Sequence, residues 1–464
     1  DVAVARLVEK PSEIRAAVDA FISSNGTLNP TSALVTGYDF FNDGAQAVIN
    51  TLTSANVSTD NLTLPLEWNA DDLRSAFLQN GHSINNINAH YTSYAALSAA
   101  GFGSGNFTDI ITAAEVNQAA NNLIRSIIFT MGCHAGLNVP DESAPNPNDL
   151  GLPIDPRADF AQALNQAIFL GSTGFGYGDD EGIGGTERLM GIFAKNLLLS
   201  GSTDVGEAIK TAKWDYLMGL STITAYEAKS SMQFTLYGLP QYKIDGQNPS
   251  SRQTTSDLNV TVTLIDGDIS TITTYPLNQV TTASGSYFAA DGVQSTPGRP
   301  VQPSLVLNLT TGSGTVHGVR LANSSFIEYP SFDPVITRPT NEWETNSSES
   351  QLLPPSFWPA DLATVNTLET GDQIFQTLVI MPGQFRPTGT NGGNVTGTER
   401  IYTSLTFELI RSADTGADYT PPTVRSIDLS ASGNTSVNVS ISASDPSGIA
   451  RIIVMTTHSG TVTA

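Results

Sequence analysis

The chain has 464 residues, which is too long for one ordinary domain and predicts two or three, each with a hydrophobic core of its own. Its formal net charge is −23 and its pI is near 4.4, so its surface repels nucleic-acid phosphates and anionic lipids, which argues against both as partners. No run of about 18 apolar residues occurs, so no membrane span is predicted. Charged residues make up only 14% of the chain, and this polar but uncharged composition favours an extracellular or cell-surface protein.

The beginning of the chain alternates helix and strand signals. An apolar series follows Pro11 and is closed by Gly26, which predicts a helix between them. "SALVTGYD" then reads as a buried strand followed by a loop. Asn69 is placed to cap a second helix, and "INNINAH" reads as a second strand that ends at His90.

The alternation continues beyond residue 110. Thr112 and Glu115 have the spacing of a capping box, and the strand "SIIFTM" follows, ending at Cys133. The dipeptide Asp155-Pro156 predicts a further helix start, which leads into the strand "AIFLGS" and a glycine-rich loop at 173–185. Two more amphipathic helices are expected near 186–199 and 203–219.

Strands and helices that alternate at this spacing predict an α/β domain over residues 1–250, with a mostly parallel sheet flanked by helices. In such sheets the functional residues lie beyond the carboxyl ends of the strands. Asp39, His90, Cys133 and the loop 173–185 all follow strands, so we expect them to gather along one edge of the sheet.

The second half of the chain has a different pattern. Segments such as "NVTVTLIDGDISTITTYPL" and "IYTSLTFELI" alternate apolar and polar residues between turn residues, which predicts an antiparallel β-sandwich over 251–418. The proline-marked "DYTPPTV" then opens a further β unit. Only about three strands fit into 419–464, so we expect an incomplete immunoglobulin-like module there.

Cys133 is the only cysteine, which excludes an intramolecular disulfide framework and a multi-cysteine metal site. A thiol becomes nucleophilic beside an imidazole, and Cys133 and His90 would face each other if their strands are neighbours. His90 would then act as acid and base, with backbone N–H groups at Cys133 and just after His90 receiving the oxyanion. The alternative is that Cys133 is a small buried apolar side chain. We expect His134 to point away from the thiol, because neighbours on an extended segment face opposite sides.

These strands and their order resemble those of the gingipain-type cysteine peptidases, within the caspase-like group. "INNINAH" and "IIFTMGC" occupy the places of the strands that carry the histidine and the cysteine, and "FTLYGLPQYKI" resembles the closing segment. The resemblance covers about residues 1–245, with 1–27 similar to the end of a subdomain that precedes the catalytic one. It implies an exported endopeptidase that needs no cofactor, acts on protein or peptide substrates, and is attached to a cell surface through a further C-terminal region.

Carried over position by position, the resemblance makes Cys133 the nucleophile, His90 the general acid/base and Asp39 the acid that orients the histidine. The loop 172–178 would form one wall of the pocket for the residue before the scissile bond. The residues implied to contact substrate are Tyr91, Gly132, Ser172, Phe175 and Tyr177.

The sequence also departs from the family pattern. Tyr91 replaces the glycine that usually follows the histidine, Leu239 replaces an aspartate, and no residue matches the acidic pocket residue of gingipains. Asp179, Asp180 and Glu181 lie near enough to substitute for that residue, or to bind calcium, although no metal is required. Two other functions therefore stay open: a catalytically inactive, peptidase-like binding or adhesion protein, and a thiol acyltransferase.

Overall fold

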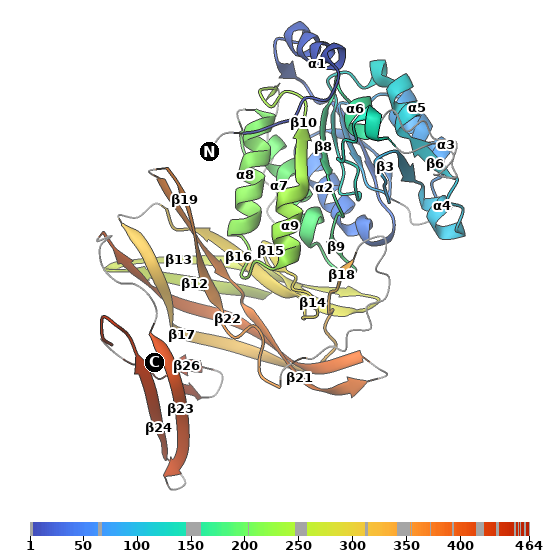
Figure 1. Ribbon diagram of the computed structural model, residues 1–464. Helices are drawn as coiled ribbons and strands as arrows, with labels where there is room; N and C mark the ends of the chain where they lie inside the picture. Colours follow the sequence, from blue (N-terminus) through green and yellow to red (C-terminus); the bar gives the residue numbers. More distant parts are fainter. Residues whose placement is uncertain are drawn as a thin grey trace.

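We analysed a computed structural model, which describes residues 3–463 with gaps at 64–66, 145–158, 203, 246–257, 311–313, 341–352, 354, 372, 392–393, 414–421, 433–435, 450–451, 453, 455 and 459–460. The chain forms an α/β part up to residue 245 and a part built of strands from residue 258 onward (Figure 1). Both predicted domain boundaries, 250/251 and 418/419, fall in gaps, so the division into domains stays a prediction. No helix in the described ranges has the length and apolar character needed to cross a membrane.

The α/β part is built around a six-stranded sheet. Five neighbouring strands are parallel and the edge strand β10 is antiparallel to β8, so the predicted mostly parallel sheet is present. The strand order is β10 (Phe234–Tyr237), β8 (Ile168–Ser172), β7 (Ile127–Phe129), β4 (Ile84–Ile87), β2 (Ser32–Thr36) and β3 (Ser58–Leu62).

Helices cover both faces of this sheet, which explains why β7 carries apolar residues on both sides. In β7, Ile127 and Phe129 pack into the cluster on one face and Ile128 packs into the cluster on the other. The first face is covered by α2 (Asn42–Ser54), α7 (Gly185–Leu198) and α8 (Val205–Met218). The second is covered by α3 (Ala70–Leu73), α4 (Ala99–Ser104), α5 (Ala113–Gln118) and α6 (Phe160–Ala163).

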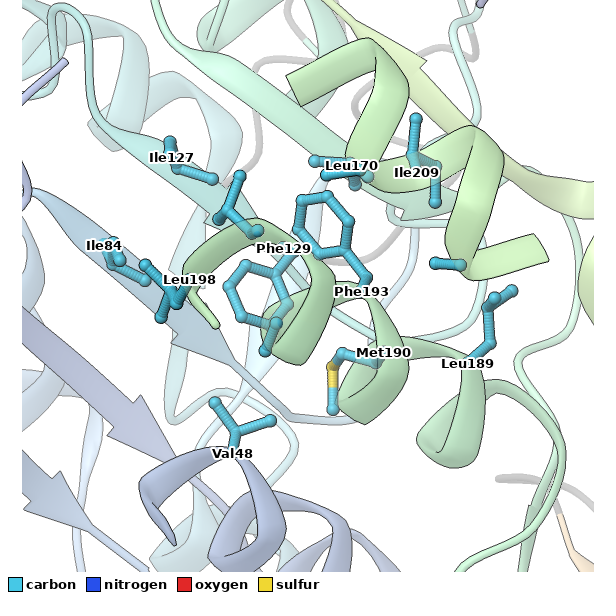
Figure 2. Packing of buried hydrophobic residues seen from close by; sticks show 14 of the residues in the cluster. Val48, Ile84, Ile127, Phe129, Leu170, Leu189, Met190, Phe193, Leu198 and Ile209 are labelled. Carbon is cyan, nitrogen blue, oxygen red and sulfur yellow. The ribbon is translucent and has the colours of Figure 1, made fainter. Parts of the chain in front are cut away.

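The packing of the first face is shown in Figure 2. Phe129 of β7 lies against Phe193 of α7, with their ring centroids 5.4 Å apart, and Val48 of α2 and Met190 of α7 lie around them. A close-packed core on each face fixes the sheet between its helices. The loops that follow the strands are therefore held on a rigid framework.

Several predicted helix starts are present. α1 (Pro11–Ser23) begins at the predicted proline, Asn69 accepts hydrogen bonds from two N–H groups of α3, and Thr112 forms a capping box with Glu115 at the start of α5. The predicted start at Asp155-Pro156 lies outside the described residues. The described helix nearest to it is α6, which is capped by Asp159.

The remaining elements of the α/β part are short, apart from α9. Two small sheets pair β5 (Ala95–Leu97) with β6 (Ile110–Thr112), and β1 (Thr27–Leu28) with β11 (Lys243–Ile244). The helix α9 (Ala225–Gln233) runs directly into β10.

The β part contains two larger sheets whose side chains share one hydrophobic cluster. β12 pairs in parallel with β22, which corrects the expectation that this half is entirely antiparallel. The first sheet consists of β14 (Gly285–Ala289), β13 (Ile269–Thr282), β12 (Leu258–Asp266), β22 (Asn394–Ser412), β17 (Thr315–Phe332), β26 (Thr461–Thr463) and β25 (Thr456–His458), with β21 (Gly383–Asn391) on β22. The second consists of β15 (Gly292–Gln294), β16 (Gln302–Asn308), β20 (Gln373–Ile380) and β19 (Ala363–Thr370).

The end of the chain forms a separate hairpin, β23 (Thr423–Ser432) with β24 (Ser436–Ser444), which projects away from the rest of the molecule (Figure 1). The short strands β25 and β26 return to the larger sheet, where β26 pairs with β17. The immunoglobulin-like module predicted for this region stays a prediction.

The two parts of the molecule are joined by backbone pairing. β9 (Gly178–Asp179), which follows β8, pairs with β18 (Pro339–Thr340) from the β part. The side chain of Asn366 donates hydrogen bonds to the carbonyls of Met218, the last residue of α8, and Leu220, at 2.9 and 2.8 Å.

Candidate functional site

The site is defined by the carboxyl ends of three adjacent parallel strands. Because β2, β4 and β7 are neighbours, the residues that follow them, Asp39, His90 and Cys133, lie at the same edge of the sheet. The backbone of Gly132 passes so close to the strand that precedes His90 that an added Cβ would lie 2.8 Å from the Ala89 carbonyl oxygen and 2.2 Å from the Tyr91 ring. The loop that carries the thiol is therefore packed on the loop that carries the imidazole.

Asp39 contacts His90. The Oδ2 atom of Asp39 lies 3.3 Å from Nε2 of His90, and the His90 side chain is 8% exposed whereas that of Asp39 is 37% exposed. Asp39 has a φ of +51°, a left-handed conformation that aspartate adopts more readily than most residues. This turn places the carboxylate beside the histidine, at the position for which the family resemblance implied an orienting acid.

Aromatic rings fix the position of His90. Its ring centroid lies 5.6 Å from that of Tyr38, 5.1 Å from Phe41 and 4.8 Å from Phe102. The backbone N–H of His90 donates to the Tyr38 hydroxyl at 2.9 Å, and that hydroxyl donates to the Leu97 carbonyl at 2.9 Å. These supporting residues were not predicted from the sequence, although Tyr38, Phe40 and Phe41 surround Asp39 in the run "GYDFFND".

Cys133 lies against the loop that follows β8. Cys133 is 2% exposed, and its thiol donates a hydrogen bond to the Gly176 carbonyl oxygen with an Sγ–O distance of 3.6 Å. The backbone of Gly176 also passes close to the thiol loop, because an added Cβ would lie 1.8 Å from the Met131 carbonyl oxygen. Two further hydrogen bonds join the loops, from His134 N–H to Gly174 O at 2.8 Å and from Gly136 N–H to Ser172 O at 2.9 Å.

His134 does not lie on an extended segment. Its φ is +58°, within a turn that begins at Cys133, so the premise that placed its side chain opposite the thiol is wrong. Its ring packs on the edge of Phe175, with centroids 4.7 Å apart. Burial lowers the pKa of His134, and the positive charge of Lys229 lowers it further, while the Thr173 backbone acts in the opposite direction.

The five residues implied to contact substrate lie at the carboxyl ends of β4, β7 and β8, and they differ in accessibility. Tyr91 is 5% exposed and its ring packs on Phe160, so its side chain is not open to a substrate. Gly132 and Ser172 are buried, and the Ser172 hydroxyl makes no hydrogen bond within the described structure. Phe175 is half-buried and Tyr177 is buried.

Helix α9 also borders this loop and was not predicted. Lys229 donates a hydrogen bond to the Tyr177 hydroxyl at 2.7 Å, and the Tyr226 ring lies 5.1 Å from that of Tyr177. Thr224 and Glu227 form a capping box at the start of α9, and this spacing in the sequence is the signal that would have identified the helix.

The acidic run beyond the loop contacts the β part through Asp179 and Asp180. Asp179 is buried at the junction with β18, and Oδ1 of Asp180 accepts a hydrogen bond from the Arg338 N–H at 2.7 Å. Burial raises the pKa of Asp179 and of Glu187 well above their usual range, and raises that of Asp43 to about 6. No group of three or more His, Cys, Asp or Glu side chains within the described residues is arranged to hold a metal ion.

Comparisons with known proteins give partial likenesses. No family model matches the chain, and no curated protein matches it. The complex of Porphyromonas gingivalis RgpB pro- and mature domains is 21% identical, with a TM-score of 0.21, over 31% of this chain and 76% of that one. A structure of gingipain K from the same organism, titled for its zymogenic latency, is 14% identical, with a TM-score of 0.23, over 35% and 97%. Both likenesses are slight.

Proposed function

We propose that this chain is a cysteine endopeptidase of gingipain type, with a caspase-like α/β domain followed by a β-sandwich. The observation that carries the proposal is the adjacency of three parallel strands that deliver Asp39, His90 and Cys133 to one edge, with Asp39 already in contact with the imidazole. A carboxylate, an imidazole and a thiol in that order are the groups that thiol acyl transfer requires.

In the proposed reaction, Nε2 of His90 faces Asp39, so Nδ1 exchanges the proton with the thiol. The Cys133 sulfur forms a bond to the substrate carbonyl carbon as its proton passes to His90. The tetrahedral oxyanion is received by the backbone N–H groups of Cys133 and Tyr91. The carbon–nitrogen bond then breaks as His90 returns the proton to the leaving amine, and water hydrolyses the resulting thioester.

The chain is acidic overall, yet only 14% of its residues are charged. This composition supports an exported enzyme that acts outside the cell or at its surface. The strand-built part is attached next to the candidate site, because β9 directly follows the loop that contacts the thiol. A role in anchoring the enzyme, or in recognising protein substrates, belongs to the same proposal.

The chain offers a matched pair of histidines for the test. His82 and His90 lie at opposite ends of β4, are 9% and 8% exposed, and each faces an aspartate, Asp60 at 3.5 Å and Asp39 at 3.3 Å. We expect Cys133→Ala and His90→Gln to abolish cleavage of a peptide library and His82→Gln to leave it intact. Unfolding in urea should report folded protein in all three. Cleavage that survives Cys133→Ala would refute the proposed nucleophile.

A second function is favoured by the burial of Cys133, which is 2% exposed and hydrogen-bonded to a backbone carbonyl. A peptidase-like binding or adhesion protein without activity would keep the thiol in this state. The two functions differ in thiol reactivity, since iodoacetamide at mildly acidic pH should label an activated thiolate rapidly and a buried, neutral thiol slowly. The thiol acyltransferase alternative predicts that an added amine is incorporated into the product in place of water.

A further inference from the structure

Helix α9 presents side chains at helical spacing to the loop beside the candidate nucleophile. Tyr226 packs on Tyr177, Lys229 contacts the same tyrosine, and the side-chain oxygen of Gln233 would lie 2.6 Å from a Cβ added at Gly174. Positions three and four residues apart lie on the same side of a helix, so this face of α9 forms one continuous wall against loop 173–177.

Lys229 is the cation of this wall. Its Nζ atom lies 2.7 Å from the Tyr177 hydroxyl, 4.8 Å from the Tyr177 ring centroid and 5.6 Å from that of Phe175. Phe175 and Tyr177 are the residues on either side of Gly176, whose carbonyl oxygen is 3.6 Å from the Cys133 sulfur. The Phe175 ring also contacts His134, the residue after the nucleophile.

Among the described residues, no carboxylate forms a salt bridge with Lys229. Its partners there are a phenol and two ring faces. The chain carries 44 acidic against 21 basic residues, so a half-buried lysine without an acid beside it is unexpected on composition alone. Such an ammonium keeps the capacity to bind an anion.

We propose that Lys229 sets the specificity of the site for an acidic side chain, glutamate or aspartate, in the residue before the scissile bond. The inference rests on the proposed peptidase function. Phe175 supplies an apolar surface for the methylene groups of such a side chain, and the ammonium pairs with its carboxylate. The same ammonium disfavours lysine and arginine at that position, because like charges repel.

Fluorogenic peptides that differ only in this residue test the proposal directly. In the wild-type protein at 0.15 M salt, where surface charges are screened beyond about 8 Å, we expect kcat/KM to be about tenfold or more higher for glutamate than for glutamine. The preference should disappear in Lys229→Gln and persist in Lys229→Arg. Lys195→Gln removes an exposed lysine from the last turn of α7 and should leave the preference unchanged.

A second measurement does not depend on peptide cleavage. Iodoacetate and iodoacetamide alkylate the same thiol, but only iodoacetate is charged. The rate with iodoacetate divided by the rate with iodoacetamide therefore reports the electrostatic potential at Cys133. A cation close to the sulfur favours the anionic reagent, and we expect the ratio to fall about three- to fivefold in Lys229→Gln. Lys229→Arg and Lys195→Gln should retain the wild-type ratio.

The outcomes separate the two proposals. Cleavage that depends on Cys133 but shows no preference for acidic residues, or prefers basic ones, would leave the peptidase standing and overturn the role of Lys229. If no peptide is cleaved, the peptidase proposal fails and the alkylation ratio decides: a fall in Lys229→Gln supports an anion-binding wall beside the thiol, and an unchanged ratio overturns it. Failure of both reagents to label the folded protein would also overturn it, since no ligand could then reach the thiol.

Discussion

Gly176 is the position at which the contact between the thiol loop and the loop after β8 is most sensitive to a small substitution. An added Cβ would lie 1.8 Å from the Met131 carbonyl oxygen, whereas ordinary contact begins at 3.4 Å, so Gly176→Ala requires the two backbones to separate by about 1.6 Å. The added Cβ is bonded directly to the Gly176 backbone, and the Met131 carbonyl is itself backbone, so neither group can rotate away. We expect the substitution to lower the free energy of unfolding by about 3 kcal/mol, the upper part of the usual range for overpacking.

Gly191→Ala is the matched control. Gly191 lies inside α7 and an added Cβ meets no atom within 4 Å, so the same substitution there should raise the free energy of unfolding by up to about 1 kcal/mol through helix propensity. Urea unfolding followed by tryptophan fluorescence measures both effects.

Thiol labelling gives an independent reading of the same displacement. Separation of the loops withdraws the Gly176 carbonyl from the Cys133 sulfur, so iodoacetamide should label Gly176→Ala faster than the wild type and Gly191→Ala at the wild-type rate. If Gly176→Ala unfolds at the same urea concentration as the wild type and is labelled no faster, the close approach of Gly176 to the Met131 carbonyl does not exist in solution.

Three further predictions concern single side chains. Asp39→Asn should reduce kcat/KM at least tenfold, because it removes the charge that faces His90. The unfolding midpoint should change little, because asparagine also tolerates a positive φ. An unchanged kcat/KM would exclude an orienting role. Burial raises the pKa of Glu399 to about 8 from its usual 4.5, so the stability that this residue contributes is complete below pH 4.5 and is lost as the pH rises through 8. Between these pH values the free energy of unfolding of Glu399→Gln should therefore fall by about 5 kcal/mol less than that of the wild type. Identical pH profiles of the two proteins would contradict this. Asn69→Ala removes the side-chain acceptor for two N–H groups at the start of α3 and should cost about 1 kcal/mol, measured in the same urea experiment, whereas an unaltered midpoint would show that the cap contributes nothing.

The sequence predicts the framework of the α/β part because its signals are local. The strand segments before Asp39, His90 and Cys133 are short, each is followed by a polar or glycine residue, and each becomes a strand of the parallel sheet. Parallel strands necessarily present their carboxyl ends at one edge, so the grouping of these three residues follows once the strands are correctly assigned.

The details of the site depend on contacts between distant positions and could not be derived in the same way. The rings around His90 include Phe102, which lies on α4, one of the helices that cover the second face of the sheet. Lys229 reaches the loop 173–177 only because α9 packs beside it, and α9 is too polar for its apolar pattern to be recognised. Likewise, no local pattern indicates that β12 pairs in parallel with β22, more than 130 positions further along the chain.

The pairing of β9 with β18 has a consequence for the integrity of the molecule. The covalent path from the α/β part to the β part runs through residues 246–257, but these two strands and the Asn366 hydrogen bonds join the parts a second time. A nick in the connecting peptide would therefore yield two fragments that co-elute in gel filtration and part only in denaturant. After limited proteolysis the α/β part, which carries Cys133, and the β part should therefore stay together as a non-covalent complex.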